Sequence, residues 1–179
     1  VISNDATAGV AAVMDPWSGA LLALAHFPFF DPATFSTTPP SRRRNRIIQD
    51  NYEPGSTFKG ILAAAAIEAG AIHPTHTLDC EQGRYAIGRR IIHDHDPYAQ
   101  LSITDIIKHS SNIGAAKIAE RMGAQAWAQA IRDFGFGRPT GIDLPGEASG
   151  IVPPVSTWRP INLATISFGQ GIAVTPIQL

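Results

Sequence analysis

Two short apolar runs open the chain, with a turn signal between them. Residues 9–15 read GVAAVMD, residues 20–27 read ALLALAHF, and the linking segment is DPWSG at 15–19. Proline suits the second position of a tight turn, and glycine relieves the backbone at its exit. The pattern predicts a β-hairpin in which both strands are largely buried.

The clearest helical pattern covers residues 57–69, TFKGILAAAAIEA. Alanine and leucine favour a helix, Pro54-Gly55 breaks the backbone before it, and Gly70 is a natural stop. Four consecutive alanines predict a helix that packs closely on several sides at the centre of a core.

Further helices are predicted nearer the C-terminus. Ser102 starts a capping-box pattern, and the apolar face that follows breaks at Ser110-Ser111-Asn112. Helices are then predicted over residues 113–122 and 124–134, and Thr175-Pro176 is typical of an N-cap followed by proline at the first helical position.

The remaining segments predict loops and short strands. Short β segments are expected around residues 84–92. Residues 28–51 and 135–160 are rich in proline, glycine or arginine and are expected to be mostly loop.

The composition is that of one globular domain or part of one, with 179 residues, 44% hydrophobic and 16% charged. A net charge of -1 gives no reason to expect nucleic acid as a partner, and the arginines at 42–46 are typical of a solvated loop. Cys80 is the only cysteine, so no intrachain disulfide can form, and it is expected to pack in the interior.

No apolar run approaches the roughly 20 residues of a membrane helix. Residues 1–8 lead directly into the first strand pattern, so we expect a longer protein with its targeting segment upstream.

Ser56-Thr57-Phe58-Lys59 is the strongest candidate for chemistry. A serine hydroxyl is a poor nucleophile until a base takes its proton, and residues three apart share one face of a helix, so the Lys59 amine can reach the Ser56 oxygen. The start of a helix also stabilises negative charge near that oxygen. Lysine acts as a base only when neutral, and burial lowers its pKa. By itself the motif is weak evidence, because chance matches are common and an N-cap serine with a solvated lysine gives the same sequence. The preceding Glu53-Pro54-Gly55 and the buried character of the helix favour the functional interpretation.

Two other polar segments gain meaning only in combination with this motif. Ser110 could relay a proton to a leaving amine, and Asn112 could hold Lys59 and a substrate amide, although a polar joint between helices would look the same. In FGQG at 168–171, two glycines allow close approach of the backbone, although a simple turn would look the same.

Taken together and in this order, the motifs resemble class B penicillin-binding proteins. The resemblance spans nearly the whole chain, and in that family Ser-x-x-Lys supplies a serine nucleophile together with a lysine. It rests on EPGSTFK at 53–59, SSNIG at 110–114, FGQG at 168–171, TPIQL at 175–179, the hairpin turn, Asn45-Arg46 and GIDLPGE at 141–147.

The resemblance implies a mixed α+β fold, with helices packed on a five-stranded antiparallel sheet and Ser56 opening the central helix. It implies a peptidoglycan D,D-transpeptidase in which Ser56 attacks the penultimate D-Ala carbonyl of a stem peptide and Lys59 accepts the hydroxyl proton. Ser110 and Asn112 complete the catalytic set, and the backbone N–H of Ser56 supplies half of the oxyanion hole. The expected substrate-binding positions are Thr57, Ser111, Gly169, Gln170 and Gly171.

The same resemblance implies the ligands and the location. Peptidoglycan stem peptides and β-lactam antibiotics are the expected ligands, and penicillin would leave a slow acyl-enzyme on Ser56. No cofactor, metal or nucleic acid is implied. The parent protein would work with membrane proteins of cell-wall synthesis and division, on the extracytoplasmic side of the bacterial inner membrane, anchored by an upstream segment.

One departure from the family concerns its third motif, Lys-Thr-Gly on a sheet-edge strand, which the 179 residues do not contain. In the family this motif follows the Gly-Gln-Gly region. We therefore expect residues 1–179 to be the N-terminal portion of a penicillin-binding transpeptidase domain, without the later strands of the sheet. Whether this portion is active alone stays open.

His93-Asp94-His95-Asp96 is the one candidate for metal binding. In an extended segment alternate residues share a face, so the two histidines and the two aspartates point opposite ways. A polar loop near the cleft is the favoured interpretation, and Ile92 to Asp94 partly resembles an Ile/Lys-Asp pair of the family.

Two alternatives stay open beside the transpeptidase. The first is a serine β-lactamase of the same superfamily, against which the Ser-Ser-Asn segment and the C-terminal motifs argue. The second is a non-catalytic β-lactam sensor or assembly partner that keeps the pocket.

Overall fold

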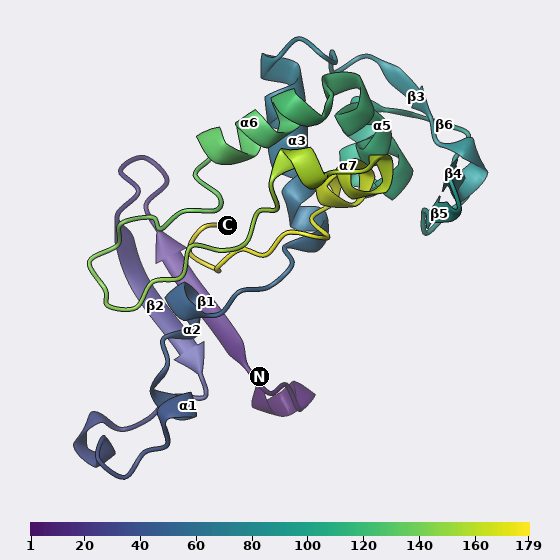
Figure 1. Cartoon of the computed structure of the whole chain (residues 1–179). Coiled ribbons are helices and arrows are strands. Elements are labelled where there is room, and N and C mark those ends of the chain that lie inside the picture. Colours follow the sequence, from purple (N-terminus) through teal and green to yellow (C-terminus); the bar gives the residue numbers. More distant parts are fainter.

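Helix α3 (Phe58–Glu68) lies at the centre of the helical part of the molecule in the computed structural model, which describes residues 1–179 (Figure 1). It contacts the four helices α4 (Ile103–Lys108), α5 (Asn112–Met122), α6 (Ala124–Asp133) and α7 (Pro160–Ser167). Ala65 and Ala66 are buried at these contacts, because small side chains let neighbouring helices approach closely. The predicted central helix is confirmed.

Aromatic rings close the core at the start of α3. The Phe58 ring lies with its centroid 5.6 Å from that of Trp127 and 5.0 Å from that of Phe136. All three side chains are buried, so this cluster fixes the first turn of α3 against α6.

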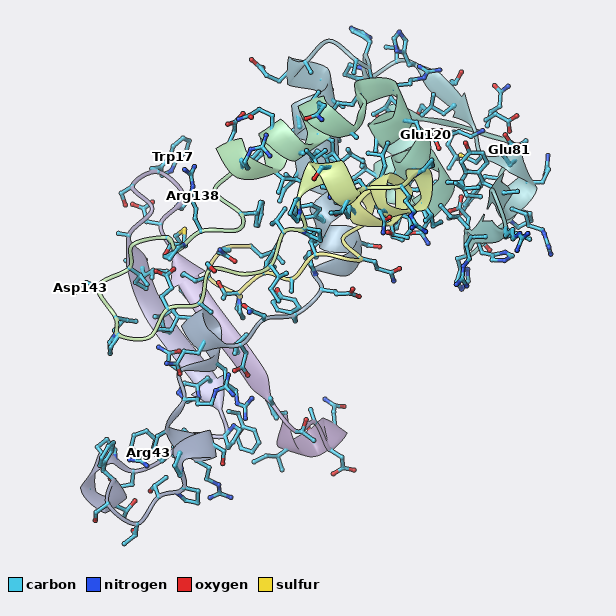
Figure 2. The ribbon with its side chains drawn as sticks, in the orientation of Figure 1. Trp17, Arg43, Glu81, Glu120, Arg138 and Asp143 are labelled. Atoms are coloured by element: carbon cyan, nitrogen blue, oxygen red, sulfur yellow. The ribbon has the colours of Figure 1, made fainter.

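The predicted hairpin is present, but the predicted burial of its strands is wrong. Strands β1 (Gly9–Met14) and β2 (Leu21–Phe27) pair antiparallel. The side chains of Val10, Val13 and Leu22 are 44%, 53% and 67% exposed. The sheet has only these two strands, and the short helix α2 (Arg46–Gln49) is the helix that packs on it. The apolar composition of a strand shows that it can be buried. Whether it is buried depends on whether another element of the fold packs on it. Trp17, in the turn, projects from the tip of the hairpin (Figure 2).

The other strands also form two-stranded antiparallel sheets. Strand β3 (Thr77–Asp79) pairs with β6 (Gln100–Ser102), and β4 (Arg84–Ile87) pairs with β5 (Arg90–His93). The β segments expected around residues 84–92 are therefore confirmed, as is the mixed fold of helices with antiparallel strands. The expected five-stranded sheet is not assembled within these 179 residues, where the strands form three separate pairs.

The helix predictions are most accurate where the pattern is long. Helices α4, α5 and α6 begin and end within a residue or two of the prediction. The Ser102 hydroxyl accepts the Asp105 N–H, which is one of the two bonds of a capping box, and it also donates to the Asp105 carboxylate. The segment 28–51 contains two helices of four residues each, α1 (Pro40–Arg43) and α2, in place of a continuous loop. The shorter 3₁₀ turns are Ile2–Asn4, Pro32–Thr34, Gly55–Thr57, Glu81–Gly83 and Val155–Thr157.

Helix α7 was missed, and the predicted helix start at Thr175 is wrong. Pro160 takes the first position of α7, and the Asn162 side chain accepts the Arg159 N–H at 3.0 Å. The sequence signal for this helix start was the proline followed two residues later by asparagine. Residues 176–178 form a turn, and the buried Thr175 hydroxyl has no hydrogen-bond partner, so it does not cap. The Gln178 side chain accepts the Thr175 N–H instead.

The C-terminal segment pairs with the segment that leads to Ser56. The backbones of Tyr52 and Val174 exchange two hydrogen bonds, of 3.0 and 2.9 Å, as an isolated antiparallel bridge. The C-terminal segment therefore anchors the beginning of the segment that leads to α3. None of the helices is both long and apolar enough to span a bilayer.

Candidate active site

Ser56 lies at the exposed entrance to the central helix. It is the middle residue of the 3₁₀ turn Gly55–Thr57, which runs directly into α3. Gly55 has a φ of 60°, a conformation that favours glycine. Backbone N–H groups at such a helix start have no partner within the helix, so they are available to an anion bound beside Ser56. The neighbouring Thr57 hydroxyl donates to the carbonyl of Pro54 at 2.7 Å and stabilises the turn.

Lys59 is the most buried charged residue, with 2% of its surface exposed. Its Nζ donates to the Ser110 carbonyl at 2.5 Å, the Ser110 hydroxyl at 2.9 Å and the Asn112 Oδ1 at 2.8 Å. Ser110 has a φ of 56°, and in this left-handed conformation both its oxygens face the amine. The fold thus brings the Ser-x-x-Lys segment and the Ser-Ser-Asn segment together.

These three bonds use all three donors of a lysine ammonium, and none of them goes to Ser56. Burial lowers the pKa of Lys59 from 10.5 to about 8, while the negative charge of Asp94 acts in the opposite direction. The amine is therefore neutral in a useful fraction of molecules near pH 8, and then one of the three contacts must be released or reversed.

Asp94 positions the Ser-Ser-Asn segment. In the sequence, the only indication of this role was the partial resemblance of Ile92 to Asp94 to the family. Its carboxylate accepts the Ser111 hydroxyl at 2.5 Å and the backbone N–H groups of Asn112 and Ile113 at 2.6 and 3.0 Å. It thereby caps the start of α5. No group of three or more His, Cys, Asp or Glu side chains is arranged to hold a metal ion.

Ser111 and Asn112 have different surroundings. Ser111 is 1% exposed, and its hydroxyl accepts the Gly114 N–H at 2.8 Å, so the structure places it in a capping role and away from direct substrate contact. The Asn112 amide nitrogen donates to the His93 carbonyl at 3.0 Å, which turns its Oδ1 toward Lys59. Cys80 packs behind this segment, and burial raises the pKa of its thiol, as expected for an unreactive core cysteine.

The FGQG segment packs directly against the turn that carries Ser56. The Gly55 N–H donates to the Gly169 carbonyl at 3.0 Å, and a Cβ added to Gly169 would overlap the Gly55 carbonyl oxygen. The Gly171 N–H donates to Glu53 Oε1 at 2.8 Å. Gly169 and Gly171 therefore position the turn through the backbone, whereas the Gln170 side chain is exposed beside it.

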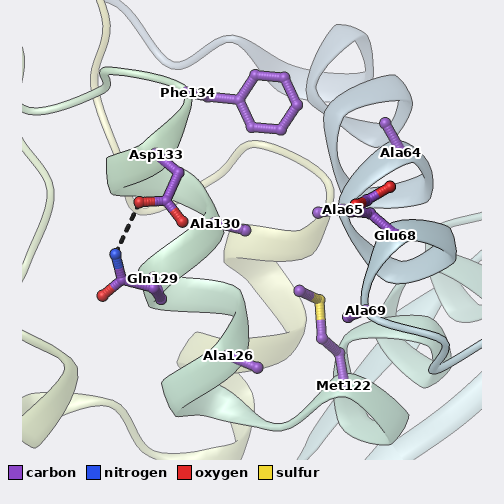
Figure 3. Close-up of a pocket in the computed structure, with 10 residues that line it drawn as sticks. All are labelled: Ala64, Ala65, Glu68, Ala69, Met122, Ala126, Gln129, Ala130, Asp133 and Phe134. Carbon is purple, nitrogen blue, oxygen red and sulfur yellow. Dashed lines mark hydrogen bonds between the residues drawn. The ribbon is translucent and has the colours of Figure 1, made fainter.

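A groove of about 520 Å³ between α3 and α6 lies away from these residues (Figure 3). Alanine side chains, Met122 and Phe134 form most of its lining, and Gln129 and Asp133 are hydrogen-bonded to each other on its rim. It contains neither Ser56 nor any member of the Lys59 cluster.

The chain is similar to known proteins along its whole length. The chain is 37% identical to the Escherichia coli peptidoglycan D,D-transpeptidase FtsI over 179 residues, which are 100% of this chain and 30% of that protein. It is 37% identical to the Bacillus subtilis stage V sporulation protein D over 172 residues, which are 94% of this chain and 27% of that protein. The chain thus spans less than a third of the length of these curated relatives.

Solved structures have the same fold. The transpeptidase domain of penicillin-binding protein 3 from Burkholderia pseudomallei superposes with a TM-score of 0.86 at 31% identity, covering 97% of this chain and 48% of that one. A Burkholderia ambifaria protein described as a peptidoglycan glycosyltransferase superposes with a TM-score of 0.88 at 31% identity, covering 99% of this chain and 52% of that one. The family model for the penicillin-binding protein transpeptidase domain matches residues 9–179, and the chain therefore belongs to that family.

Proposed function

We propose that the protein carrying this chain is a peptidoglycan D,D-transpeptidase that works through an acyl-enzyme on Ser56. The observation that carries the proposal is the buried Lys59 amine, with its lowered pKa, held one helical turn from Ser56 by Ser110 and Asn112. Membership of the transpeptidase family supports the same reaction class.

In the proposed mechanism, Ser56 attacks the penultimate D-Ala carbonyl of a stem peptide. The neutral Lys59 amine accepts the hydroxyl proton, the terminal D-Ala leaves, and an amine of a second stem peptide resolves the ester. A neutral amine has two N–H donors and one lone pair. Lys59 can therefore keep its bonds to the Ser110 carbonyl and Asn112 while its lone pair faces the Ser56 hydroxyl. Once Lys59 has taken the Ser56 proton, its ammonium donates to the Ser110 hydroxyl as it does in the structure, and Ser110 passes its own proton to the leaving amine while it takes one from Lys59. The Ser56 N–H supplies one oxyanion donor.

We assign residues 1–179 to the N-terminal portion of a transpeptidase domain, because they cover about half of each solved relative and contain no Lys-Thr-Gly sequence. The protein would act outside the bacterial cytoplasmic membrane, where peptidoglycan stem peptides and β-lactams reach it, together with membrane proteins of cell-wall synthesis and division. Similarity to the peptidoglycan transpeptidase FtsI supports this location, because peptidoglycan lies outside that membrane.

The direct test is to label the complete protein with a fluorescent penicillin and to identify the modified residue by peptide mapping. We expect a single ester on Ser56 that is released slowly. A label on any other residue would overturn the assignment. Rapid hydrolysis of penicillin would instead favour the β-lactamase alternative, because a transpeptidase resolves its acyl-enzyme with an amine far better than with water.

The pH dependence of acylation should follow the ionisation of Lys59. We expect the second-order rate constant for acylation by benzylpenicillin to rise as pH increases, and to level off above about pH 8, because only the neutral amine can accept the Ser56 proton. Replacing Asp94 by Asn removes the negative charge that raises the pKa of Lys59, so the midpoint should move to lower pH.

The matched control for this prediction is Asp96→Asn. Asp96 lies two residues away and its side chain is 58% exposed, so its removal should leave the midpoint unchanged. The measurement is stopped-flow acylation between about pH 6 and pH 10, a range that brackets the Lys59 pKa. The assignment of Lys59 as the base fails if the midpoint is the same in the unmodified protein and in the Asp94 variant.

A further inference from the structure

The β4–β5 hairpin carries positive charge that no acidic group of the chain neutralises. Arg84, Arg89 and Arg90 form no ion pair, whereas Arg44 and Arg46 are both paired with Asp50. Two acidic side chains near the hairpin are already engaged (Figure 2), since Glu120 accepts the Tyr85 hydroxyl and Glu81 pairs with Lys117 at 2.6 Å.

Arg90 differs from its neighbours because it lines a groove beside the active site. The groove has a volume of about 370 Å³, and its walls come from β5, from Ile161 and Thr165 of α7, and from the FGQG segment. It also includes Asn112, whose Oδ1 accepts from Lys59, and Phe168, whose ring centroid lies 6.0 Å from the Lys59 Nζ. The groove is therefore continuous with the Lys59 cluster.

The pairing of the hairpin explains why Arg90 reaches this groove. Arg90 pairs with Ile87, and Ile92 pairs with Tyr85, so these four side chains share one face of the hairpin. Ile92 on that face is buried against the body of the domain, where β5 contacts α5. Arg89 lies in the turn between the strands and does not line the groove.

We propose that this groove is the subsite for the residue that precedes D-Ala-D-Ala in the acyl donor, and that Arg90 recognises a carboxylate on it. The inference rests on the proposed transpeptidase function. Ile161 and Phe168 offer apolar contacts for a methylene chain, and the guanidinium of Arg90 is a fork of donors that matches a carboxylate. A stem peptide with a diamino diacid before its terminal D-Ala pair carries a free carboxylate at that residue, so the charge and the apolar walls fit this class of acyl donor.

Two penicillins that differ by one carboxylate provide the test. Carbenicillin is benzylpenicillin with an added carboxylate on the acylamino side chain, the part of a penicillin that occupies the position of the preceding residue. We expect Arg90→Ala in the complete protein to lower the ratio of the acylation rate constants for carbenicillin over benzylpenicillin about tenfold at low salt, with a smaller fall at high salt. Arg90→Lys should retain part of the ratio, and Arg89→Ala should leave it unchanged.

Benzylpenicillin serves as the internal control for folding of each variant. If Arg90→Ala slows both penicillins equally, or if Arg89→Ala lowers the ratio as much, the carboxylate subsite is disproved while the transpeptidase function stands. If neither penicillin acylates Ser56 in the unmodified protein, the proposed function and the subsite both fail.

Discussion

Replacing Ser56 with alanine is expected to reduce acylation by penicillin at least about a thousandfold in the complete protein. Two neighbouring hydroxyls are not free to act in its stead, because the Thr57 hydroxyl is held by the Pro54 carbonyl and the Ser111 hydroxyl is buried. The Ser110 hydroxyl is bonded to Lys59 and has the proposed relay role. The Ser56 side chain is exposed and its removal leaves no cavity, so the thermal midpoint of unfolding should change little. Fluorescent penicillin labelling with quantified acyl-enzyme gives the measurement.

The same variant separates the transpeptidase from the sensor alternative. Loss of cell-wall cross-linking in cells that depend on the protein is expected with Ser56→Ala. Retained cross-linking, in a variant that no longer accepts penicillin, would show that catalysis is not the task of this protein. Thr57→Ala is the matched control, because it removes the adjacent hydroxyl and should keep acylation measurable.

Substituting Gly169 with alanine is expected to destabilise the domain by roughly 3 kcal/mol or more. Two effects add at this position. The φ of Gly169 is 75°, which strains any residue with a Cβ, and that Cβ would overlap the backbone O of Gly55 and lie 2.6 Å from its backbone N. Backbone atoms cannot move aside as a flexible side chain does, so the turn that carries Ser56 must shift and acylation should fall as well. Chemical denaturation and stopped-flow acylation measure the two effects.

Gly70→Ala is the control that measures the backbone strain of a positive φ without a steric overlap of the added Cβ. Gly70 has a φ of 66°, and a Cβ there would meet no atom within 4 Å, so the expected loss is about 1 kcal/mol with acylation unchanged. Equal losses for the two glycines would show that close approach of the FGQG segment to Gly55 does not contribute.

The helices were predictable where local signals agreed with one another. Helix α3 combines a Pro-Gly break, an alanine run and a terminal glycine, and α4 has a serine N-cap whose hydroxyl accepts the Asp105 N–H. Helix α7 escaped because its eight residues include isoleucine and threonine and carry no sustained polar face. The exposure of β1 and β2 was not predictable, because burial of a strand is decided by which elements pack on it.

The candidate site was predictable in its residue types and only partly in its contacts. Ser56 and Lys59 belong to one helix, so their proximity follows from helical geometry. The contacts of Lys59 with Ser110 and Asn112 join residues 51 and 53 positions apart and could be inferred only through family resemblance. The role of Asp94 depends on how β5 places its end against the start of α5, which is a property of tertiary packing.

The bridge between Tyr52 and Val174, the bond from Gly55 to Gly169 and the bond from Gly171 to Glu53 tie one short stretch of chain to another at three successive levels. The backbone that carries Ser56 is therefore hydrogen-bonded to a second segment and cannot move independently of residues 169–174. A small molecule that separated residues 169–174 from this backbone would inactivate Ser56 without binding in the substrate cleft. Resistance substitutions that alter the lining of the cleft would not protect against such a molecule.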